Sequence, residues 1–425
     1  MADATASEVP SEIRPGLLRT ADGRPLKSAL ARASRRARIR AFLLVLPLLA
    51  FVFVTFAIPI TQMLSRSVVN TQFSANMPEL GAWFAENPGI EPTEAAYAAL
   101  AADLKAAAAN RTIGNAGTRI NYEVSGTRSL FTSTGRTAAR LEPPFREALL
   151  ETNPDWGRPD LWAAMRAASS GTTLNFYQSA LDRRIGPDGK FAPVEDQGAI
   201  YKKLFMRTFV LSIVITGLCL LLGFPVAHLL AVLPLRYASL LMILVLLPFW
   251  TSLLVRTTSW MVLLQGQGVV NNTLVALGLV SDGNRLAMMY NQTGTIIAMT
   301  HILLPFMILP LYSVMKTIPP AYARAARSLG ATSWTTFRRI YLPQTVPGIG
   351  AGGILVFILA VGYYITPALV GGADGTLISN QIAFHMQTSL NWSLAAALAA
   401  MLLGAVLVLY WAYDRMVGID NMKLG

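Results

Sequence analysis

Cysteine, histidine and charge are all scarce in this sequence. Its 425 residues include one cysteine, Cys219, so no disulfide can form within the chain. The three histidines, His228, His301 and His385, show no metal-ligand spacing. Charged residues make up only 14% of the chain, well below the roughly 25% of an ordinary soluble domain. These absences argue against a disulfide-stabilised fold, a histidine metal site and a water-soluble protein.

The chain also lacks the patterns that nucleotide hydrolysis and other enzyme chemistry require. The only Gly-Lys pair, Gly189 and Lys190, is followed by Phe191, so no G-x-x-x-x-G-K-[ST] loop is present to hold a nucleotide. The apolar segments show no nucleophile–base pair and no paired carboxylates. We therefore expect no catalytic residue, no metal and no cofactor on this chain.

Hydrophobic residues dominate instead, at 53% of the chain with a mean hydropathy of +0.46. Several apolar runs reach the length of about 20 residues that a helix needs to cross a bilayer. They predict an all-α polytopic membrane protein with six transmembrane helices, at residues 41–63, 208–233, 238–255, 294–315, 347–366 and 392–413. The net charge of +12 comes from Lys and Arg beside these segments and not from a patch interleaved with aromatics, so membrane lipid is the expected contact and nucleic acid is not.

The charge distribution predicts the orientation of the chain. Residues 1–40 form a basic tail, which the positive-inside bias places in the cytoplasm, followed by the first transmembrane helix at 41–63. Six crossings return the 416–425 tail to the cytoplasm. Residues 64–203 differ, because between positions 70 and 203 the 14 Lys and Arg are balanced by 15 Asp and Glu. They are predicted to be a translocated, periplasmic insertion ahead of a membrane core at 204–415.

Short helices are predicted within the insertion. Thr93 would cap an alanine-rich helix, and EPPFREALLE and RPDLWAAMRAA predict two more, whereas INYEV is typical of a strand. Because each helix has few large apolar residues, we expect the insertion to pack on the outer mouth of the protein instead of forming a large core. The sequence does not decide between a periplasmic docking surface or vestibule lid and an evolutionary spacer.

The most informative stretch is the basic loop, residues 316–347, which lies between two predicted spans and holds five Lys and Arg but no acidic residue. Apolar side chains recur at helical spacing in each half of it. Gly330 stands where a left-handed residue would end the first helix, Thr332 or Ser333 could cap a second, and Pro343 would end that one. The loop is predicted to be a helix, a glycine turn and a helix on the cytoplasmic side.

The order and spacing of Ala325-Ala326, Gly330, Ile340 and Leu342-Pro343 resemble the cytoplasmic EAA loop of ATP-binding cassette importer permeases. The resemblance implies the six-span fold of type I importer permeases and a coupling helix that docks in a separate ATPase subunit. It assigns to the loop Tyr322, Arg324, Ala325, Ala326, Arg327, Leu329, Gly330, Ile340, Leu342 and Pro343. Arg324 departs from the pattern, because the family has a glutamate there, and this puts the glutamate's pairing in doubt.

The resemblance also implies partners and a location. These are a second permease subunit, which could be a copy of this chain, a cytoplasmic ATPase dimer that holds ATP and Mg, a periplasmic solute-binding protein, and the bacterial inner membrane. The stretches LPFWTSLLVRTTSWMVLLQGQGVVN, GYYITPALVGG and NWSLAAALA resemble the polyamine (spermidine/putrescine) branch. Together these similarities cover roughly half of the chain and leave the insertion unaccounted for.

A solute pathway is expected among polar and aromatic residues in the outer half of the core. Arg256 ends an apolar run, where an arginine either takes part in the pathway or reaches the membrane interface. Trp250, Trp260, Tyr363 and Tyr364 could surround an amine through cation–π contacts, although aromatic belts occupy the same depth.

The charge of the solute stays open. Between residues 204 and 413 the only acidic residues are Asp282 and Asp374, whereas a pathway for a polycation would be expected to hold carboxylates. Arg256 would suit a carboxylate. A polyamine, an opine-like or amino-acid-like compound and other small organic solutes are all compatible with the sequence.

The sequence thus predicts the permease subunit of an ATP-driven importer that moves a small periplasmic solute into the cytoplasm by alternating access. The alternative is an ion-gradient-driven secondary transporter, but inverted repeats and intramembrane acidic residues, which are common in such proteins, are not evident. A third possibility is a scaffold in which residues 204–425 serve only as an anchor.

Overall fold

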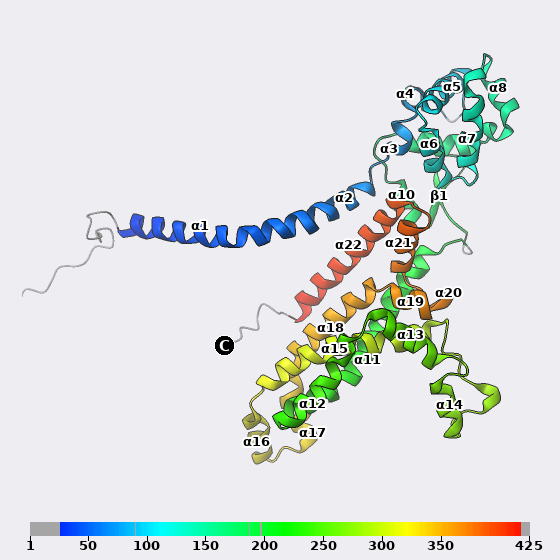
Figure 1. The fold of residues 1–425 in the computed structure, drawn as a ribbon. Coiled ribbons are helices and arrows are strands. Elements are labelled where there is room, and N and C mark those ends of the chain that lie inside the picture. The colour runs from blue at the N-terminus through cyan, green and yellow to red at the C-terminus, as the bar shows by residue number, and fades with distance from the viewer. Residues whose placement is uncertain (1–25, 90, 187, 196–197, 418–425) are drawn as a thin grey trace, which may run out of the picture. The chain divides into compact units, whose positions relative to one another are not determined.

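A computed structural model describes residues 26–89, 91–186, 188–195 and 198–417, and divides into two units, Met1–Met63 and Leu64–Gly425 (Figure 1). Residues 1–25 and 418–425, which make up most of the two predicted tails, lie outside the described residues.

The first unit is built on one long apolar helix. It runs through α1 (Leu26–Val52), a π-helical turn η1 (Phe53–Ala57) and α2 (Ile58–Arg66), which continues past the boundary between the units. The hydroxyl groups of Thr55 and Thr61 donate to backbone carbonyls four residues earlier, so their polarity is satisfied within the helix. Residues Ser34–Arg66 are long and apolar enough to cross a membrane, as predicted for the first span.

Residues 67–200 fold into short helices and one hairpin. The helices are α3 (Thr71–Ser74), α4 (Pro78–Glu86), α5 (Glu94–Ala109), α6 (Ile113–Asn121), α7 (Thr127–Thr137), α8 (Phe145–Thr152), α9 (Pro159–Ala168) and α10 (Asn175–Ala180), with 3₁₀ turns η2 (Ala138–Arg140) and η3 (Pro154–Gly157). Strands β1 (Arg183–Ile185) and β2 (Phe191–Pro193) pair antiparallel. The three predicted helices correspond to α5, α8 and α9.

The predicted strand at INYEV is wrong, because its first residues end helix α6. Ala116 and Ile120 are fully buried and lie four residues apart, on one face of that helix. Burial of this helical face in the surrounding core overrides the β-propensity of the short run.

The expectation that the insertion lacks a large core is also wrong. A single cluster of buried side chains joins helices α3 to α9, and at its centre lie Trp156, Trp162, Phe131 and Tyr97. Trp162 packs edge-on against Tyr97, with ring centroids 4.9 Å apart. The alanines of α5 and α9 let neighbouring helices approach these rings, so a few large side chains surrounded by alanines fill the interior.

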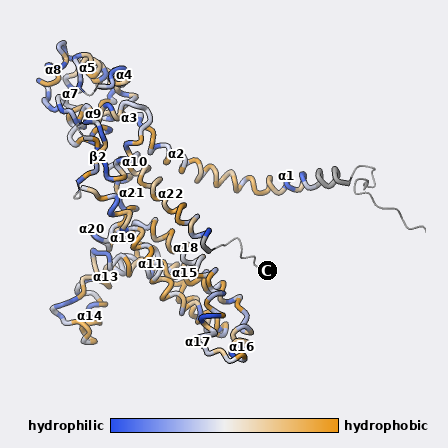
Figure 2. Tube along the Cα trace, turned by 180° about the vertical axis from the view of Figure 1, so that it is seen from behind, coloured by the Kyte–Doolittle hydropathy of each residue, from blue (hydrophilic) through white to orange (hydrophobic). Residues whose placement is uncertain are grey.

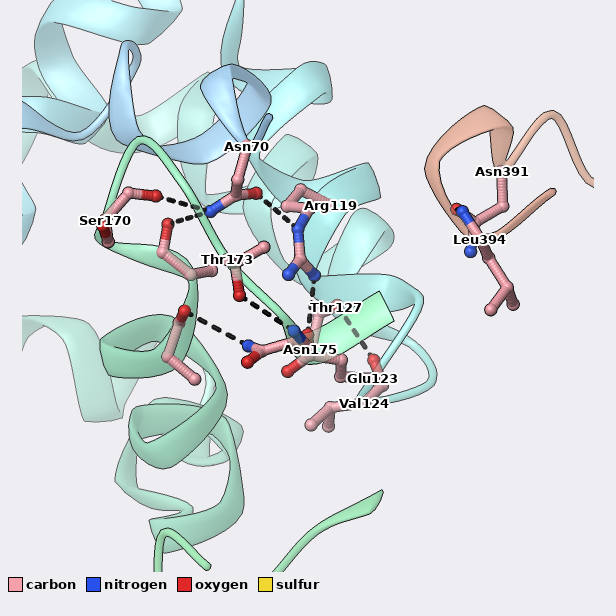
Figure 3. Close-up of polar contacts among 12 residues, drawn as sticks. Asn70, Arg119, Glu123, Val124, Thr127, Ser170, Thr173, Asn175, Asn391 and Leu394 are labelled. Atoms are coloured by element: carbon pink, nitrogen blue, oxygen red, sulfur yellow. Dashed lines mark hydrogen bonds and ion pairs between the residues drawn. The ribbon is translucent and has the colours of Figure 1, made fainter. Parts of the chain in front are cut away.

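Within the insertion, the segments around residues 68–70 and 171–173 lie side by side (Figure 3). The backbone of Asn70 donates to the carbonyl of Gly171, and that of Thr173 donates to the carbonyl of Val68. The Asn70 amide also donates to the carbonyls of Ala168 and Ser170 and accepts from buried Arg119 at 2.6 Å. Because these two segments are adjacent, the part of the insertion between them leaves and returns to the same place in the fold.

Three helices begin at N-cap residues whose side chains make no capping hydrogen bond. In each case a carboxylate from a distant part of the insertion caps the helix instead. Asp103 accepts from the backbone N–H groups of Glu79 and Leu80 at the start of α4. Glu94 does the same for α8, and Asp182 for residues 200–202 at the start of α11. Burial raises the pKa of Asp103 to about 6, against the lowering effect of its two backbone hydrogen bonds.

The membrane core contains four long apolar helices or helical segments, along which hydrophobic residues are concentrated in Figure 2. They are α11 (Tyr201–Val232), α15 (Gln292–Thr317), the run from α17 (Ser333–Thr336) through a π-turn η6 (Phe337–Tyr341) to α18 (Leu342–Gly362), and α22 (Trp392–Val417). Helix α15 is the most buried of them and packs against both α11 and α18. These helices correspond to predicted spans two, four, five and six.

The third predicted span is not one continuous helix. It is made of α12 (Leu235–Leu246) and a 3₁₀ turn η4 (Leu247–Trp250), after which α13 (Leu253–Leu264) and α14 (Val269–Ala276) follow. The direction of the chain changes by 98° at this break. Pro248 cannot donate a helical backbone hydrogen bond, which explains why the α-helix α12 ends just before it. The Ser252 hydroxyl caps α13 by accepting from the backbone N–H of Val255, which explains why α13 begins at Leu253.

Short helices complete the end of the core that lies next to the insertion, and side-chain contacts tie the insertion to it. The helices are α19 (Ile365–Val370), α20 (Gly372–Gly375) and α21 (Ile378–Gln387), and a 3₁₀ turn η5 (Asp282–Asn284) precedes α15. Phe176 of α10 packs in a cluster with Leu394 and Leu398 of α22, and the Tyr122 hydroxyl donates to the carbonyl of Leu390.

Candidate functional site

The first half of the basic loop is helix α16 (Pro320–Ser328), which ends in a left-handed glycine. Gly330 has a φ of +85°, and no atom lies within 4 Å of the position that a Cβ would occupy. The backbone of Ala331 donates to the carbonyl of Ala326, which is the six-to-one bond of a Schellman motif. The carbonyls of Ala325 and Ala326 thus accept hydrogen bonds at the end of the helix. Glycine is needed at position 330 because of the left-handed backbone conformation, since there is room for a larger side chain.

The second half begins with a side-chain cap and continues into the membrane. The Thr332 hydroxyl accepts from the backbone of Thr335 at 3.2 Å, so Thr332 is the cap. The predicted end at Pro343 is wrong, because α17, η6 and α18 form one continuous run. A proline inside a helix cannot donate the usual backbone hydrogen bond, and its ring crowds the carbonyl four residues earlier. The wider π-turn at 337–341 accommodates the missing hydrogen bond and the ring of Pro343, so the helix continues.

An aromatic column connects this second half to helix α11. Trp334 stacks on Phe337 with ring centroids 5.8 Å apart, and Phe337 stacks on Tyr341 at 6.2 Å. Phe224 of α11 meets Phe337 edge-on at 6.0 Å. His228, also of α11, lies 2.9 Å from the Tyr341 hydroxyl through its Nδ1 atom. The second half of the loop is therefore packed against the C-terminal part of helix α11.

A cavity of about 670 Å³ lies between α16 and the ends of α11 and α15. Its lining includes Lys316, Arg324, Arg327, Tyr341 and His228, and no acidic residue. Ile340 also lines it, whereas Leu342 lies in the first turn of α18. Four of the predicted loop residues, Tyr322, Arg324, Arg327 and Ile340, thus line a hollow that carries positive charge.

Three of the five predicted pathway residues, Arg256, Trp260 and Tyr363, come together with a histidine. Arg256 and Trp260 lie one turn apart on α13, and the Trp260 indole donates to Nδ1 of His301 on α15 at 3.1 Å. Arg256 is close enough to His301 and Tyr363 for its charge to act on both. We call Arg256, Trp260, His301 and Tyr363 the pathway cluster.

The other two predicted pathway residues do not join the cluster through any described contact. The Trp250 side chain is 77% exposed at the end of η4. The Tyr364 backbone carbonyl accepts from Asn380, and its side chain is partly exposed. His301 was not among the predicted pathway residues, although an ionisable side chain inside an apolar helix is a signal that could have indicated it.

The hydrogen bonds within the pathway cluster leave N–H groups of His301 and Arg256 that could donate to another molecule. An indole N–H can only donate, so Nδ1 of His301 is unprotonated and the ring proton of the neutral imidazole is on Nε2. The Nε atom of Arg256 is buried without a hydrogen-bond partner. No described ion pair includes Arg256, since Asp282 and Asp374 pair with Arg285 and Arg207 instead.

The part of the chain that holds the basic loop and the pathway cluster matches a known protein family. A model of the family described as "Binding-protein-dependent transport system inner membrane component" matches residues 201–417, just over half of the 425-residue chain and all of both sites described above. The chain belongs to this family. It is a permease subunit of an ABC-type importer, an all-α, multi-pass protein of the inner membrane that acts as a translocation component, as the resemblance of the basic loop implied.

Relatives of this permease include two proteins of Escherichia coli (strain K12). It is 36% identical over 221 residues to the spermidine/putrescine transport system permease protein PotB, covering 51% of this chain and 80% of PotB. It is 33% identical over 231 residues to the inner membrane ABC transporter permease protein YdcU, covering 51% of this chain and 71% of YdcU. A bacterial ABC transporter involved in the import of the acidic polysaccharide alginate matches 69% of this permease and all of its own chain, with 20% identity and a TM-score of 0.46.

Proposed function

We propose that this permease moves a small organic solute from the periplasm to the cytoplasm with energy from ATP and Mg bound to a separate ATPase dimer. A second permease subunit, either a copy of this chain or a different one, completes the pathway, and a periplasmic binding protein delivers the solute. The observation that carries the proposal is the exposed helix–glycine–helix loop at 316–347 on a chain that has no nucleotide-binding motif. Such a chain receives its energy either from another protein or from an ion gradient, and the exposed loop favours contact with another protein.

We place both termini and the basic loop in the cytoplasm and the insertion in the periplasm. The unpaired cations of the loop and the Arg-rich start of the chain support this orientation through the positive-inside bias. The balanced charge of residues 70–203 is compatible with translocation, because long external segments are insensitive to that bias.

Alternating access would then follow from the contacts of the loop. Closure of the ATPase dimer displaces α16, and the turn at Gly330 passes the movement to α17 and η6. The stacked rings of Trp334, Phe337 and Tyr341 lie against α11, so that helix and α18 move with the loop. Packed aromatic contacts transmit such displacements because close-packed interiors do not deform freely.

Two solute classes have support. The names of the PotB relatives include spermidine and putrescine, which places a polyamine first by similarity. The pathway cluster favours a second class, a solute with a carboxylate, because Arg256 has no acidic partner among the described residues and His301 offers a donor. A polyamine would instead have to pass Arg256 by using aromatic faces and carbonyl groups.

Reconstitution with the energy source controlled tests the proposal against an ion-driven transporter. Proteoliposomes that contain the permease with its partner subunits are loaded with ATP and Mg and treated with an ionophore that removes the proton gradient. We expect solute uptake to persist and to stop when ATP is replaced by a non-hydrolysable analogue. Uptake that survives without ATP but stops with the ionophore would show the alternative to be correct.

A further inference from the structure

The loop that we propose as the coupling element exposes large apolar side chains in an unusual place. Leu329 is 89% exposed, Trp334 68% and Tyr322 53%, and Leu329 and Tyr322 precede the start of the helical segment that enters the bilayer. Apolar side chains grouped on a surface outside the membrane mark a contact with another molecule. The described chain has no segment packed over them.

The same surface is strongly and exclusively basic. Lys316, Arg324, Arg327, Arg338 and Arg339 are all exposed, and none of them is in a described ion pair. Lys316 and Arg327 donate only to backbone carbonyls of the chain itself, those of Ala231 and Ala323. The hollow under α16 is also lined by cations without a carboxylate. The loop therefore presents positive charge that the described part of the chain does not neutralise.

A protein groove fits this surface better than a lipid surface does. Helices that lie in a membrane interface carry a broad face of large apolar residues. Helix α16 has nine residues, and between Tyr322 and Leu329 its small side chains are Ala323, Ala325 and Ala326, with Ser328 at its end. Small residues in that position allow close approach of another backbone, as when a helix lies in a groove.

We propose, on the basis of the function proposed above, that the groove of the partner ATPase that receives α16 has an apolar floor and an acidic rim. Leu329 and Tyr322 contact the floor, and Arg324 and Arg327 pair with carboxylates on the rim. Removing apolar contacts weakens such a complex at any ionic strength, whereas removing charge pairs at a rim weakens it mainly at low salt.

The test measures the affinity of the permease complex, in detergent, for the ATPase subunit of the same transport system over a range of salt concentrations. We expect affinity to fall as salt rises. Arg324→Glu with Arg327→Glu should lower it at least about tenfold at low salt and remove most of the salt dependence. Arg415→Glu, at an exposed arginine of α22 outside the loop, is the matched control and should have little effect.

Leu329→Ala separates this inference from the function on which it rests. If Leu329→Ala weakens binding but the double charge reversal and salt do not, the groove is not acidic and the inference is wrong while the docking function stands. If neither variant changes binding, or no ATPase binds, the proposed function fails as well. If the charge reversal instead reduces binding to phosphatidylglycerol vesicles and leaves ATPase affinity unchanged, the basic surface serves lipid and the inference is overturned.

Discussion

The Nδ1 atom of His228 lies 2.9 Å from the hydroxyl of Tyr341, and their rings meet edge-on with centroids 5.0 Å apart. This contact joins helix α11 to the π-turn that follows the basic loop. Both residues line the cavity under α16, so we expect a displacement of the loop to change this contact. We regard it as the first link between the loop and the membrane helices.

Removing this hydrogen bond should loosen that link without disturbing the fold. Tyr341→Phe keeps the aromatic column but removes the hydroxyl, and a hydrogen bond of this kind contributes about 0.5–1.5 kcal/mol. We expect the amount of solute transported per ATP hydrolysed to fall about two- to tenfold. Parallel measurements of ATP hydrolysis and uptake in proteoliposomes check this, and an unchanged ratio would mean that the contact is not used.

Arg256 should determine how well the pathway binds its solute. If the solute carries a carboxylate, Arg256→Ala removes a charge-assisted hydrogen bond of about 1.5–3 kcal/mol and should raise the KM for uptake about 10- to 100-fold. Arg256→Lys should recover part of that loss, because it keeps the charge but not the paired donors. Arg285→Gln is the control, since Arg285 is already paired with Asp282. A KM that is the same in Arg256→Ala and the parent would indicate an arginine that only reaches the membrane interface.

The stability of the insertion should depend on pH through Asp103. Its pKa is raised to about 6 in the folded chain, above the ordinary value of 3.8, so the folded state binds a proton more readily than the unfolded state. Stability is therefore greater below pH 4 than above pH 6 and falls as the pH rises through this window, by about 1–3 kcal/mol.

Hydrogen exchange of the full-length permease, corrected for intrinsic rates, can measure this effect in peptides from α4 and α5. Protection should be greater at pH 5 than at pH 7. Asp103→Asn should abolish the difference because the amide does not titrate, whereas Asp155→Asn, at an exposed carboxylate, should preserve it. Equal protection at the two pH values in the parent chain would contradict the raised pKa.

Much of the membrane core could be predicted because its elements carry local signals. The apolar lengths that predict spans, and the pattern Gly330 then Thr332 that predicts a left-handed turn and a cap, depend on a few neighbouring residues. The end predicted at Pro343 was wrong because a π-turn can absorb a proline within a continuing helix. That adjustment depends on the packing of Phe337 and Tyr341, which the local sequence does not specify.

The insertion was harder to predict because its stability comes from distant contacts. Asp103, Glu94 and Asp182 cap helices that begin far away in the sequence, and no local pattern indicates such a cap. Its core relies on two tryptophans surrounded by alanines, which appear as alanine-rich helices when they are considered one at a time. In the pathway cluster, the position of His301 inside an apolar helix was a local signal, but its contact with Trp260 depends on the packing of α13 beside α15.

The measurement that tests the proposed function most directly is ATP-driven uptake by two variants of Gly330. A β-branched residue at a φ of +85° costs of order 1–3 kcal/mol, whereas asparagine tolerates the left-handed region, and open space around the position excludes a clash in either variant. We expect Gly330→Val to insert into the membrane normally and to lose uptake by at least about tenfold, while Gly330→Asn retains most of it. Undiminished uptake by Gly330→Val would contradict the proposal that this turn transmits the work of the ATPase to the membrane helices.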